Sequence, residues 1–490
     1  MTKVFPDIDR FNKLKEKNSF IPIFTSLPVM NETPLSLYER LYRNLSFTFL
    51  LYSGGIQDEN SSFSFLGTFH EPFVKGSLES NHLEQLQSIL DSSRSEEINY
   101  LIHFWGGAIG YFGYDILHLF EKIQRITPDD LEIPEIFIGF TDEVIVFDHR
   151  ENLIKIIICL KRDDDYTQGI ERLHELLSKL KGEKPAMSEA CPEQPRRVEG
   201  TGVRNLKSNM TKNHFKNMVD KAKEYIRAGD IFQANLSHRF EGDFEGDPWE
   251  FYKQLSNINP SPFGGFINFG DMFIVSASPE RLIKVTPLCP PLVRRGMGWG
   301  IETRPIAGTR PRGKNRSEDI ILSRELLLNE KERAEHIMLV DLERNDLGRV
   351  CKYGTVRVDE LMTLESYSHV WHIVSKVIGE LQDNIKFVDI LRACFPGGTI
   401  TGCPKVRCME IIEELEPARR GIYTGSMGYI GYNGITDLNI IIRSALIKKG
   451  KIYFHAGAGI VADSDPEREY EETLFKAGAI IEVLKKSLRT

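Results

Sequence analysis

The stretch Phe395-Pro-Gly-Gly-Thr-Ile-Thr-Gly-Cys-Pro-Lys405 leads directly into Val406-Arg-Cys-Met-Glu-Ile-Ile-Glu-Glu-Leu-Glu-Pro417. Glycines and hydroxyl residues in such a short loop leave backbone N–H groups open to a ligand. Apolar residues then recur at helical spacing and predict a helix that begins after Pro404 and ends before Pro417. A loop of this kind at a helix N-terminus is a candidate anion site, and an ordinary loop-to-helix turn is the alternative.

The composition indicates a chain that buries a large core and does not bind nucleic acid. It has 490 residues, 41% hydrophobic and 27% charged, enough for one large domain or two. The net charge of -8 argues against a nucleic-acid partner. Seven cysteines without a framework spacing are typical of a reducing compartment. The sequence contains no signal-peptide pattern and no long apolar run, so we expect a cytoplasmic protein without a membrane anchor.

A polar segment divides the chain into two regions. Residues 182–202 are rich in Pro, Glu, Ser and Arg, which predicts an exposed linker over 181–205. We therefore expect an N-terminal region over 1–180 and a second, catalytic region over 206–490. Within the latter, the Pro- and Gly-rich segment 287–300 separates two strand-like stretches, and we interpret it as a surface insertion at a hairpin tip.

Helices alternate with antiparallel hairpins along the chain. Helical periodicity is found at 166–182, at 215–229 and from 466 to 488. Three strand-like stretches within 424–461 are separated by Asn433-Gly434 and Lys449-Gly450, which are hairpin signals. This order of elements is typical of the α+β class.

The stretch 231–240 alternates between apolar and polar residues and predicts a strand with two different faces. Phe232 is on the apolar face, and the polar face consists of Gln233, Asn235, Ser237 and Arg239. We expect the polar face to meet solvent, the commoner outcome for such a strand, with a cavity as the alternative.

Two pairs of glutamates stand one helical turn apart in distant segments. Glu332 and Glu335 form the first pair, and Glu469 and Glu472 form the second, with Lys476 one further turn along. Pairs from two helices can hold one hard divalent ion, for which Mg²⁺ with retained waters is the natural choice. The alternative for each pair is a solvated helix surface with intrahelical ion pairs.

Single residues elsewhere suit the binding of a small polycarboxylate. Glu280 follows an apolar strand, where burial would raise its pKa and suit it to donate a proton, and a capping turn is the alternative. His372 lies in an apolar stretch and is otherwise a core residue. Arg443, between apolar residues, is a cation that needs an anion, and Gly457-Ala-Gly459 offers backbone N–H groups at a strand end.

Four motifs in order resemble one family, the chorismate-utilising enzymes. They are Arg304-Pro-Ile-Ala-Gly-Thr309, Leu339-Val-Asp-Leu-Glu-Arg-Asn-Asp346, Gly397-Gly-Thr-Ile-Thr-Gly-Cys-Pro-Lys405 and Gly457-Ala-Gly-Ile-Val-Ala-Asp-Ser464. The family includes anthranilate synthase component I, aminodeoxychorismate synthase component I and the isochorismate and salicylate synthases. The resemblance implies a two-lobed α+β fold, a β-sandwich of largely antiparallel sheets wrapped by helices, and a Mg²⁺-dependent reaction on chorismate.

The resemblance also implies a role for each matching residue. Glu335 and Glu472 would hold Mg²⁺, with Glu332 and Glu469 in or beside its shell. Glu280 would be the general acid that expels the C4 hydroxyl, and His372 would orient or assist it. The ring carboxylate would be held by Mg²⁺ with Thr401 and Lys476, and the enolpyruvyl carboxylate by Tyr429, Arg443, Gly457 and Gly459; Gln233, Ala307 and Thr309 are further substrate-binding candidates.

Two positions bear on which reaction of the family is catalysed. Isochorismate and salicylate synthases carry a water-activating lysine where this chain has Gln233, so amination is favoured over hydration. Leu50-Leu-Tyr-Ser-Gly54 looks like aminodeoxychorismate synthase, whereas Ala307 replaces a lysine of many such enzymes and matches anthranilate synthase. The resemblance therefore favours 4-amino-4-deoxychorismate, for 4-aminobenzoate and folate synthesis, with anthranilate, for tryptophan synthesis, as the alternative.

The resemblance also bears on regulation and on partners. Ser53 and Pro262 mark a candidate regulatory pocket, and Gly264 replaces a methionine that contacts the inhibitor in tryptophan-regulated anthranilate synthases. The chain has no Gly-x-Cys-x-Gly nucleophile turn with partner His and Glu, so the implied ammonia source is a separate glutamine amidotransferase subunit. A catalytically silent subunit that binds chorismate or tryptophan is a further alternative.

Overall fold

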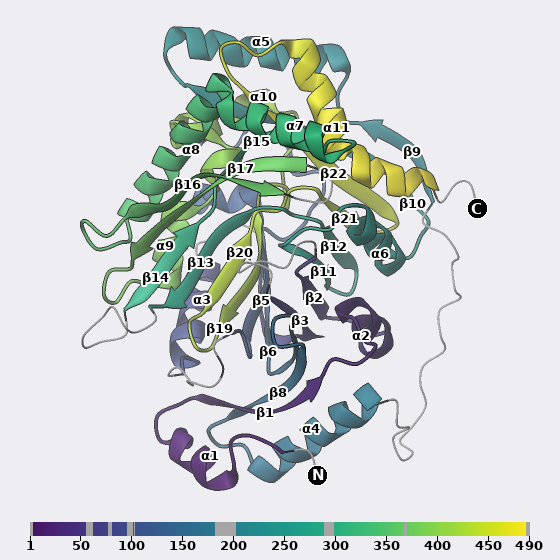
Figure 1. Ribbon diagram of the computed structural model, residues 1–490, viewed down its shortest axis with the longest axis vertical. Helices are drawn as coiled ribbons and strands as arrows, with labels where there is room; N and C mark the ends of the chain where they lie inside the picture. The colour runs from purple at the N-terminus through teal and green to yellow at the C-terminus, as the bar shows by residue number, and fades with distance from the viewer. Residues whose placement is uncertain are drawn as a thin grey trace.

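The computed structural model describes residues 3–54, 62–76, 81–95, 101, 103–181, 202–288, 298–366 and 370–486. Within these ranges the strands form two antiparallel sheets, of twelve and ten strands (Figure 1). The first sheet has the order β1 (Phe20–Pro28), β8 (Leu153–Lys161), β7 (Glu143–Asp148), β3 (Phe63–Thr68), β2 (Thr48–Tyr52), β11 (Gly264–Asn268), β12 (Met272–Ser276), β21 (Ser444–Lys448), β22 (Lys451–Ile460), β10 (Gln233–Phe244) and β18 (Gly402–Cys403), with β9 (Val203–Ser208) beside β10. The second has the order β15 (Ile306–Pro311), β17 (Val370–Glu380), β14 (Trp299–Thr303), β13 (Arg281–Pro287), β20 (Thr436–Asn439), β19 (Ser426–Gly431), β5 (Gly107–Phe112), β6 (Ile136–Thr141) and β4 (His70–Gly76), with β16 (Arg357–Ser366) beside β17.

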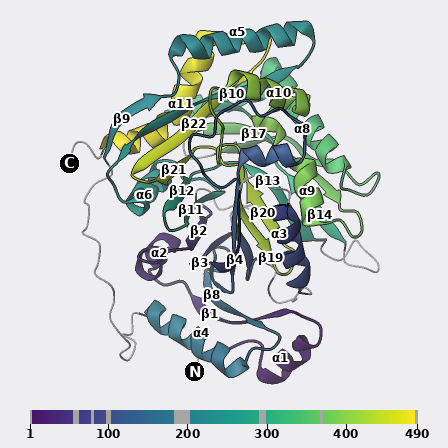
Figure 2. The same cartoon turned by 180° about the vertical axis from the view of Figure 1, so that it is seen from behind.

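Helices surround the two sheets. They are α1 (Ile8–Lys15), α2 (Pro34–Leu41), α3 (Asn81–Ser92), α4 (Tyr166–Lys181), α5 (Lys212–Ala228), α6 (Pro248–Ile258), α7 (Arg316–Leu328), α8 (Glu330–Gly348), α9 (Phe387–Cys394), α10 (Lys405–Leu415) and α11 (Pro466–Lys486), with short 3₁₀ turns η1 (Tyr114–Leu119) and η2 (Gly398–Ile400). Both views place α5, α10 and α11 at one end of the molecule and α1 and α4 at the other (Figures 1 and 2).

The main hydrophobic core lies between the two sheets. Phe49 and Phe65 come from the first sheet, and Tyr111 and Phe137 come from the second. The ring of Phe65 meets the ring of Tyr429, on β19 of the second sheet, edge to face with centroids 5.2 Å apart. Apolar residues from both sheets are therefore removed from water together, which makes the two sheets one sandwich.

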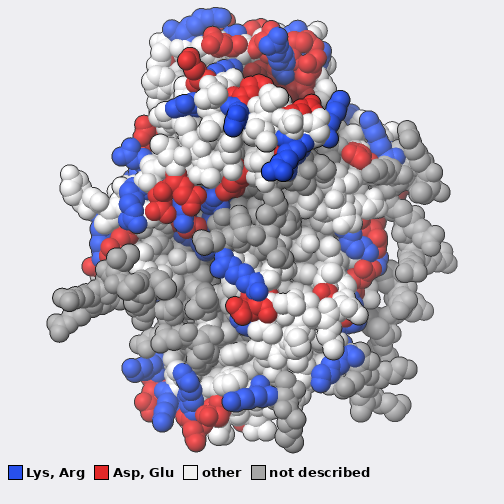
Figure 3. Space-filling model, in the orientation of Figure 1, with Lys and Arg blue, Asp and Glu red and all other residues white. Residues whose placement is uncertain are grey.

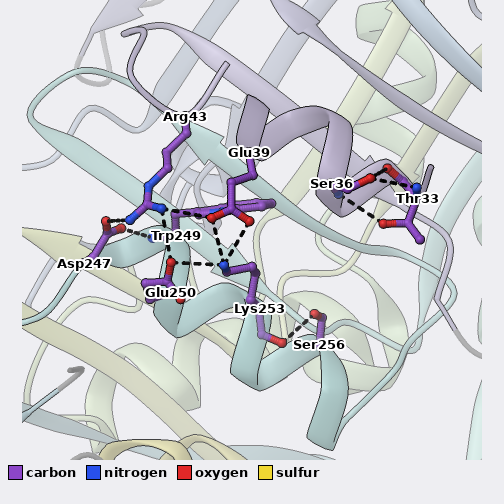
Figure 4. A network of polar contacts seen from close by, with 9 residues as sticks. All are labelled: Thr33, Ser36, Glu39, Arg43, Asp247, Trp249, Glu250, Lys253 and Ser256. Atoms are coloured by element: carbon purple, nitrogen blue, oxygen red, sulfur yellow. Dashed lines mark hydrogen bonds and ion pairs between the residues drawn. The ribbon is translucent and has the colours of Figure 1, made fainter. Parts of the chain in front are cut away.

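A second core lies on the outer face of the first sheet, under α2, α4, α6 and α11. Tyr38 of α2 contacts Trp249 of α6, with ring centroids 4.4 Å apart. Figure 4 shows ion pairs around Trp249, including Arg43 with Asp247 at 2.6 Å and Lys253 with Glu39 at 3.0 Å. Exposed ion pairs contribute about 0–1 kcal/mol each, whereas a fully buried aromatic contributes about 1.5–3 kcal/mol. The aromatic contact therefore holds α2 on α6 more firmly than the charges do.

Both sheets contain strands from both of the regions expected from the sequence. In the first sheet β2 pairs with β11, and in the second β5 pairs with β19. Residues 1–180 and 206–490 therefore share one core rather than forming a sheet each. Most of the expected linker, residues 182–201, lies outside the described ranges.

The expected hairpin around the insertion is present. Strands β13 and β14 pair antiparallel as far as Pro287 opposite Trp299, and Leu288 N donates to Gly298 O at 2.8 Å. Most of the insertion, residues 289–297, lies outside the described ranges. The helix predicted over 215–229 is also confirmed. It is α5, and Gly229 ends it with a φ of 81°.

The strand predicted over 231–240 is present as β10, but two expectations about its faces were wrong. Its polar face does not meet solvent, because Gln233, Ser237 and Arg239 are all buried in β10. Phe232, expected on the apolar face, lies just before the strand and is 69% exposed. Gln233 donates to Glu335 of α8, Ser237 to Glu416 after α10, and Arg239 to Asp130, and the single-strand pattern contains no information about these distant partners.

The surface carries charges of both signs. Lys and Arg side chains are interspersed with Asp and Glu side chains over the face seen in Figure 3. No helix in the described part of the chain combines the length and apolar character needed to cross a membrane.

Candidate active site

The candidate active site lies where β10, β22, α8 and α11 meet. Gln233 begins β10 and is 3% exposed, and its Nε2 donates a hydrogen bond to Glu335 Oε1 of α8 at 2.9 Å. A Cβ on Gly459 of β22 would lie 2.6 Å from Gln233 Nε2 and 3.7 Å from Glu335 Oε1. The glycine thus leaves the room in which the two side chains meet, and these three predicted site residues are neighbours.

Lys476 of α11 connects several predicted site residues. Its Nζ donates to Gly457 O at 3.0 Å and lies 2.6 Å from Glu472 Oε1. Burial raises the pKa of both Glu335 and Glu280, and the positive charge of Lys476 opposes that effect at each. One cation is therefore close to both the expected metal ligands and the expected general acid.

The four predicted metal ligands form two pairs on facing helices, Glu332 with Glu335 on α8 and Glu469 with Glu472 on α11. Burial raises the pKa of Glu335 and of Glu469, and the second carboxylate of each pair raises it further. The charge of Lys331 lowers the pKa of Glu335 and of Glu469 alike, so the two pairs face the same region.

The donor chemistry of these pairs fits Mg²⁺, although the four side chains do not converge on one point. Among the described residues, no three His, Cys, Asp or Glu side chains are close enough to hold a single metal ion. Glu472 pairs with Lys476, and Glu332 pairs with Arg310 at 3.2 Å. Mg²⁺ commonly binds one or two carboxylates together with waters and substrate oxygens, so one glutamate from each helix suffices.

Arg443 is a half-buried cation for which the described residues supply no ion-pair partner. Its φ of 54° lies in the left-handed region, which is uncommon for a residue other than glycine. Its Nη1 donates to Lys476 O at 3.1 Å, and burial lowers its pKa. A guanidinium in this setting is suited to bind a substrate carboxylate, as expected from the sequence.

Tyr423 lies beside Arg443 and was missed by the sequence analysis. A Cβ on Gly457 would lie 2.9 Å from the Tyr423 hydroxyl, and Tyr423 and Arg443 influence each other's pKa. Tyr429, the residue expected here, instead stacks on Phe104 with ring centroids 4.5 Å apart. Tyr423, six residues before Tyr429 in the same segment, is therefore the tyrosine that lies beside Arg443 and Gly457.

His372 of β17 faces the bulge of β15 at Gly308. Its Nδ1 lies 3.1 Å from Gly308 O and 3.1 Å from Thr309 Oγ1. A carbonyl oxygen can only accept, so the first contact requires a proton on Nδ1 and makes Nε2 the basic nitrogen. Burial lowers the pKa of His372 to about 4, and the ring is neutral at pH 7. Ala307, on the other side of the bulge, is buried.

Glu280 is a buried carboxyl, 5% exposed, between β12 and β13. Burial raises its pKa from 4.5 to about 8. The Thr399 hydroxyl, the Ile306 backbone amide and Lys476 lower the pKa, whereas the Glu343 carboxylate raises it further. Glu280 therefore carries a proton at neutral pH, which is the state that a general acid needs.

The loop after Phe395 packs tightly against β10. Thr401 is fully buried, and its hydroxyl donates to Gly397 O at 2.9 Å. The φ of Gly402 is 136°, and a Cβ there would lie 2.1 Å from Gln233 O, so only glycine fits. The hydroxyl hydrogen of Thr401 is thus engaged within the loop, and the loop brings β18 to the start of β10.

A separate cavity of about 250 Å³ lies between the two sheets, lined by residues of β2, β3, β11, β13, β19 and β20. It contains Ser53 and Pro262, the two residues expected to form a regulatory pocket, and also Tyr429. Ser53 Oγ donates to Phe63 O at 2.8 Å and lies 3.3 Å from Pro262 O. Residues of the candidate active site built above do not line this cavity.

The sequence and the fold are similar to those of known proteins. The sequence profile of chorismate binding enzymes matches residues 49–482. Anthranilate synthase component 1 of Aquifex aeolicus is 39% identical over 497 residues, which cover 98% of this chain and 97% of that protein. Aminodeoxychorismate synthase component 1 of Bacillus subtilis is 46% identical over 384 residues, 78% of each chain. The crystal structure of anthranilate synthase component I from Streptococcus pneumoniae has a TM-score of 0.73 at 32% identity, covering 93% of this chain and 98% of that one.

The fold of two antiparallel sheets is thus similar to that of a solved anthranilate synthase component I. The chain belongs to the chorismate binding enzyme family. The α+β fold and the family predicted from the sequence are both confirmed.

Proposed function

We propose that this enzyme aminates chorismate to 4-amino-4-deoxychorismate, with Mg²⁺ as cofactor. The presence of Gln233 in the site is the observation that best supports amination. A glutamine amide cannot deprotonate water, as hydration of chorismate requires. Its Oε1 is buried without a hydrogen-bond partner among the described residues and can accept from an ammonia N–H. The Bacillus subtilis relative carries the name of this reaction, which supports the choice.

The two carboxylates of chorismate would bind at opposite ends of the site. Arg443 and Tyr423, with the backbone of Gly457, would hold the enolpyruvyl carboxylate, since no carboxylate of the described ranges forms an ion pair with this guanidinium, although Glu472 is near enough to raise its pKa. Lys476 would face the ring carboxylate. Thr401 would shape the loop beside it and could add its hydroxyl only if that group turned away from Gly397.

The metal would bind at the end of the site that holds the ring carboxylate. When bound, Mg²⁺ would neutralise the ring carboxylate and orient the ring, as a hard cation does for a carboxylate oxygen. Glu335 and Glu472 would hold it, with Glu332 and Glu469 beside them. Gln233 is hydrogen-bonded to Glu335 and would thereby fix the direction of that carboxylate.

Glu280 would act as the general acid. Its proton would pass to the C4 hydroxyl, which leaves as water when the C–O bond breaks. The nitrogen lone pair of ammonia would form the new C–N bond, and a proton released from nitrogen would restore the carboxyl. His372, neutral at pH 7, would orient the departing hydroxyl together with Thr309.

Formation of anthranilate with release of pyruvate is the second candidate, and Ala307 favours it. Ala307 is buried beside Gly308, and ammonia would have to attack the ring without a lysine there. The Aquifex aeolicus relative, which spans nearly the whole chain, carries this name. Glu280 would expel the same hydroxyl in both reactions, so the two differ in the step that follows.

Ammonia would come from a separate glutamine amidotransferase subunit. Relatives of both kinds are named component 1, which supports the existence of a second component. Free ammonium at alkaline pH should replace that subunit, because unprotonated ammonia is the nucleophile in either case.

Product identity tests the proposal. The enzyme is incubated with chorismate, Mg²⁺ and ammonium, with and without an added aminodeoxychorismate lyase, and products are followed by fluorescence and mass. A chorismate-derived amine that becomes 4-aminobenzoate only with the lyase supports the proposal. Fluorescent anthranilate formed without the lyase would replace it by the second candidate.

We also propose that the cavity around Ser53 and Pro262 is a regulatory pocket. Its aromatic wall includes Tyr429, and Asp437 and Lys284 supply charges of both signs, a combination that suits an aromatic amino acid such as tryptophan. Tryptophan should inhibit turnover and bind measurably by calorimetry. Absence of heat at millimolar tryptophan would exclude this role.

A further inference from the structure

Glu343 is a buried carboxylate that the proposed mechanism does not use. It lies on α8 eight residues, or about two helical turns, after Glu335, and it is 5% exposed. Burial is the main cause that raises its pKa to about 7, and the neighbouring Asp346 adds to the shift. A buried carboxylate is costly unless it is hydrogen-bonded or paired, so its surroundings need an explanation.

The groups that face Glu343 belong to two segments that also face Glu280. The Thr303 hydroxyl and the Gly398 backbone amide both lower the pKa of Glu343, and a Cβ on Gly398 would lie 3.3 Å from Glu343 Oε1. Thr303 ends β14, and the chain reaches Ile306 three residues later. Gly398 directly precedes Thr399. Ile306 and Thr399 are the backbone amide and the hydroxyl that face Glu280.

The charges around this cluster come from several elements. Glu280 is faced by Glu343 from α8 and by Lys476 from α11. Glu343 is faced by Asp346 of its own helix, Lys405 of α10 and Cys394 of α9. Lys405 is committed to a buried ion pair with Asp346. The negative charge of Glu343 is therefore only partly balanced, and it acts on Glu280 through an apolar interior.

We infer that Glu343 is a positioning residue for Glu280. It holds the Thr303–Ile306 segment and the Gly398–Thr399 turn, which both contact the proposed general acid, and its negative charge favours the protonated, proton-donating form of Glu280. Helix α8 thus contributes to two parts of the site. Its first turns carry a pair of expected metal ligands, and its later turns carry Glu343, which acts on Glu280. The inference rests on the proposed function, in which Glu280 acts as the acid.

Glu343→Gln tests the inference because the amide keeps an acceptor oxygen for Thr303 and Gly398 but removes the charge. The basic limb of the kcat/KM profile should move to lower pH by about 1 unit, and kcat at neutral pH should fall severalfold with KM for chorismate nearly unchanged. Glu343→Asp restores the charge and should return the basic limb toward the wild-type position. Asp341→Asn removes an equal charge from the exposed side of α8, where the side chain is 62% exposed, and should leave the profile unchanged.

A direct titration separates failure of this inference from failure of the proposed function. Protein labelled with ¹³C at the glutamate carboxyl reports the titration of Glu280 by NMR, with Glu280→Gln supplying the assignment. Glu280 should titrate at lower pH in Glu343→Gln than in the wild type, whatever reaction the enzyme catalyses. Identical titration in the two proteins would overturn the inference. Wild-type protein that leaves chorismate unchanged would overturn the proposed function instead.

Discussion

Replacing Glu280 by glutamine should abolish turnover and should also stabilise the fold at alkaline pH. Burial raises the pKa of Glu280 from 4.5 to about 8. In the unfolded chain the carboxyl titrates at its ordinary value, so between these two pH values the unfolded state releases a proton that the folded state keeps. The stability that this carboxyl contributes is complete below the unfolded pKa and is lost as the pH rises through the folded pKa. Glutamine, which does not ionise, avoids that loss.

The size of the effect follows from the shift. One pKa unit corresponds to about 1.4 kcal/mol, so the wild type should lose about 3 kcal/mol between pH 5 and pH 8 relative to the variant. With an unfolding entropy of roughly 2 cal/mol/K per residue, 1 kcal/mol shifts the Tm of a chain of this length by about 1 °C. The Tm of the variant should therefore gain about 3 °C on the wild type over that range and level off above it.

Calorimetric scans of both proteins across this pH range measure the difference. Glu171→Gln, which alters an exposed glutamate on α4, is the matched control and should follow the wild type at every pH. Parallel Tm curves for the wild type and Glu280→Gln would refute the reasoning, because they would mean that the carboxyl titrates alike in the folded and unfolded chains.

Three further experiments test other parts of the site. Glu472→Ala should abolish Mg²⁺-dependent turnover while leaving the circular dichroism spectrum unchanged, and near-normal activity would contradict its role as a ligand. Tyr423→Phe should raise KM for chorismate by about 10-fold, whereas Tyr429→Phe should leave KM unchanged, and the reverse pattern would restore the assignment expected from the sequence. Gly459→Ala places a Cβ 2.6 Å from Gln233 Nε2, so KM should rise with little change in Tm, since only a side-chain end has to move; an unaltered KM would argue against Gln233 lining the site.

Local sequence patterns predicted the secondary structure because the signals lay in the residues themselves. Gly229 ends α5 with a positive φ, as its position after the periodic segment predicts. Asn433-Gly434 joins β19 to β20 and Lys449-Gly450 joins β21 to β22, as hairpin signals do, whereas the middle strand expected from the sequence is divided into β20 and β21, which belong to different sheets. The burial of Glu280 and its raised pKa were also predictable, because this residue follows an apolar strand.

Features that depend on distant neighbours were not predictable. The polar face of β10 is buried because Gln233, Ser237 and Arg239 bond to carboxylates of distant segments, and alternation along one strand cannot indicate such partners. Val406, an apolar residue in the first turn of α10, is 39% exposed because the helix packs through Cys408, Met409 and Ile412 instead. Residues 1–180 and 206–490 both contribute strands to each sheet. These strands pair over long sequence distances, which composition does not indicate.

Chorismate consumption measured by chromatography and mass spectrometry tests the central claim most directly. The enzyme is incubated with chorismate and with Mg²⁺, ammonium, both or neither. The account predicts that chorismate is converted to a nitrogen-containing product only when Mg²⁺ and ammonium are both present. Unchanged chorismate in all four mixtures, or conversion to a nitrogen-free isomer without ammonium, would contradict it.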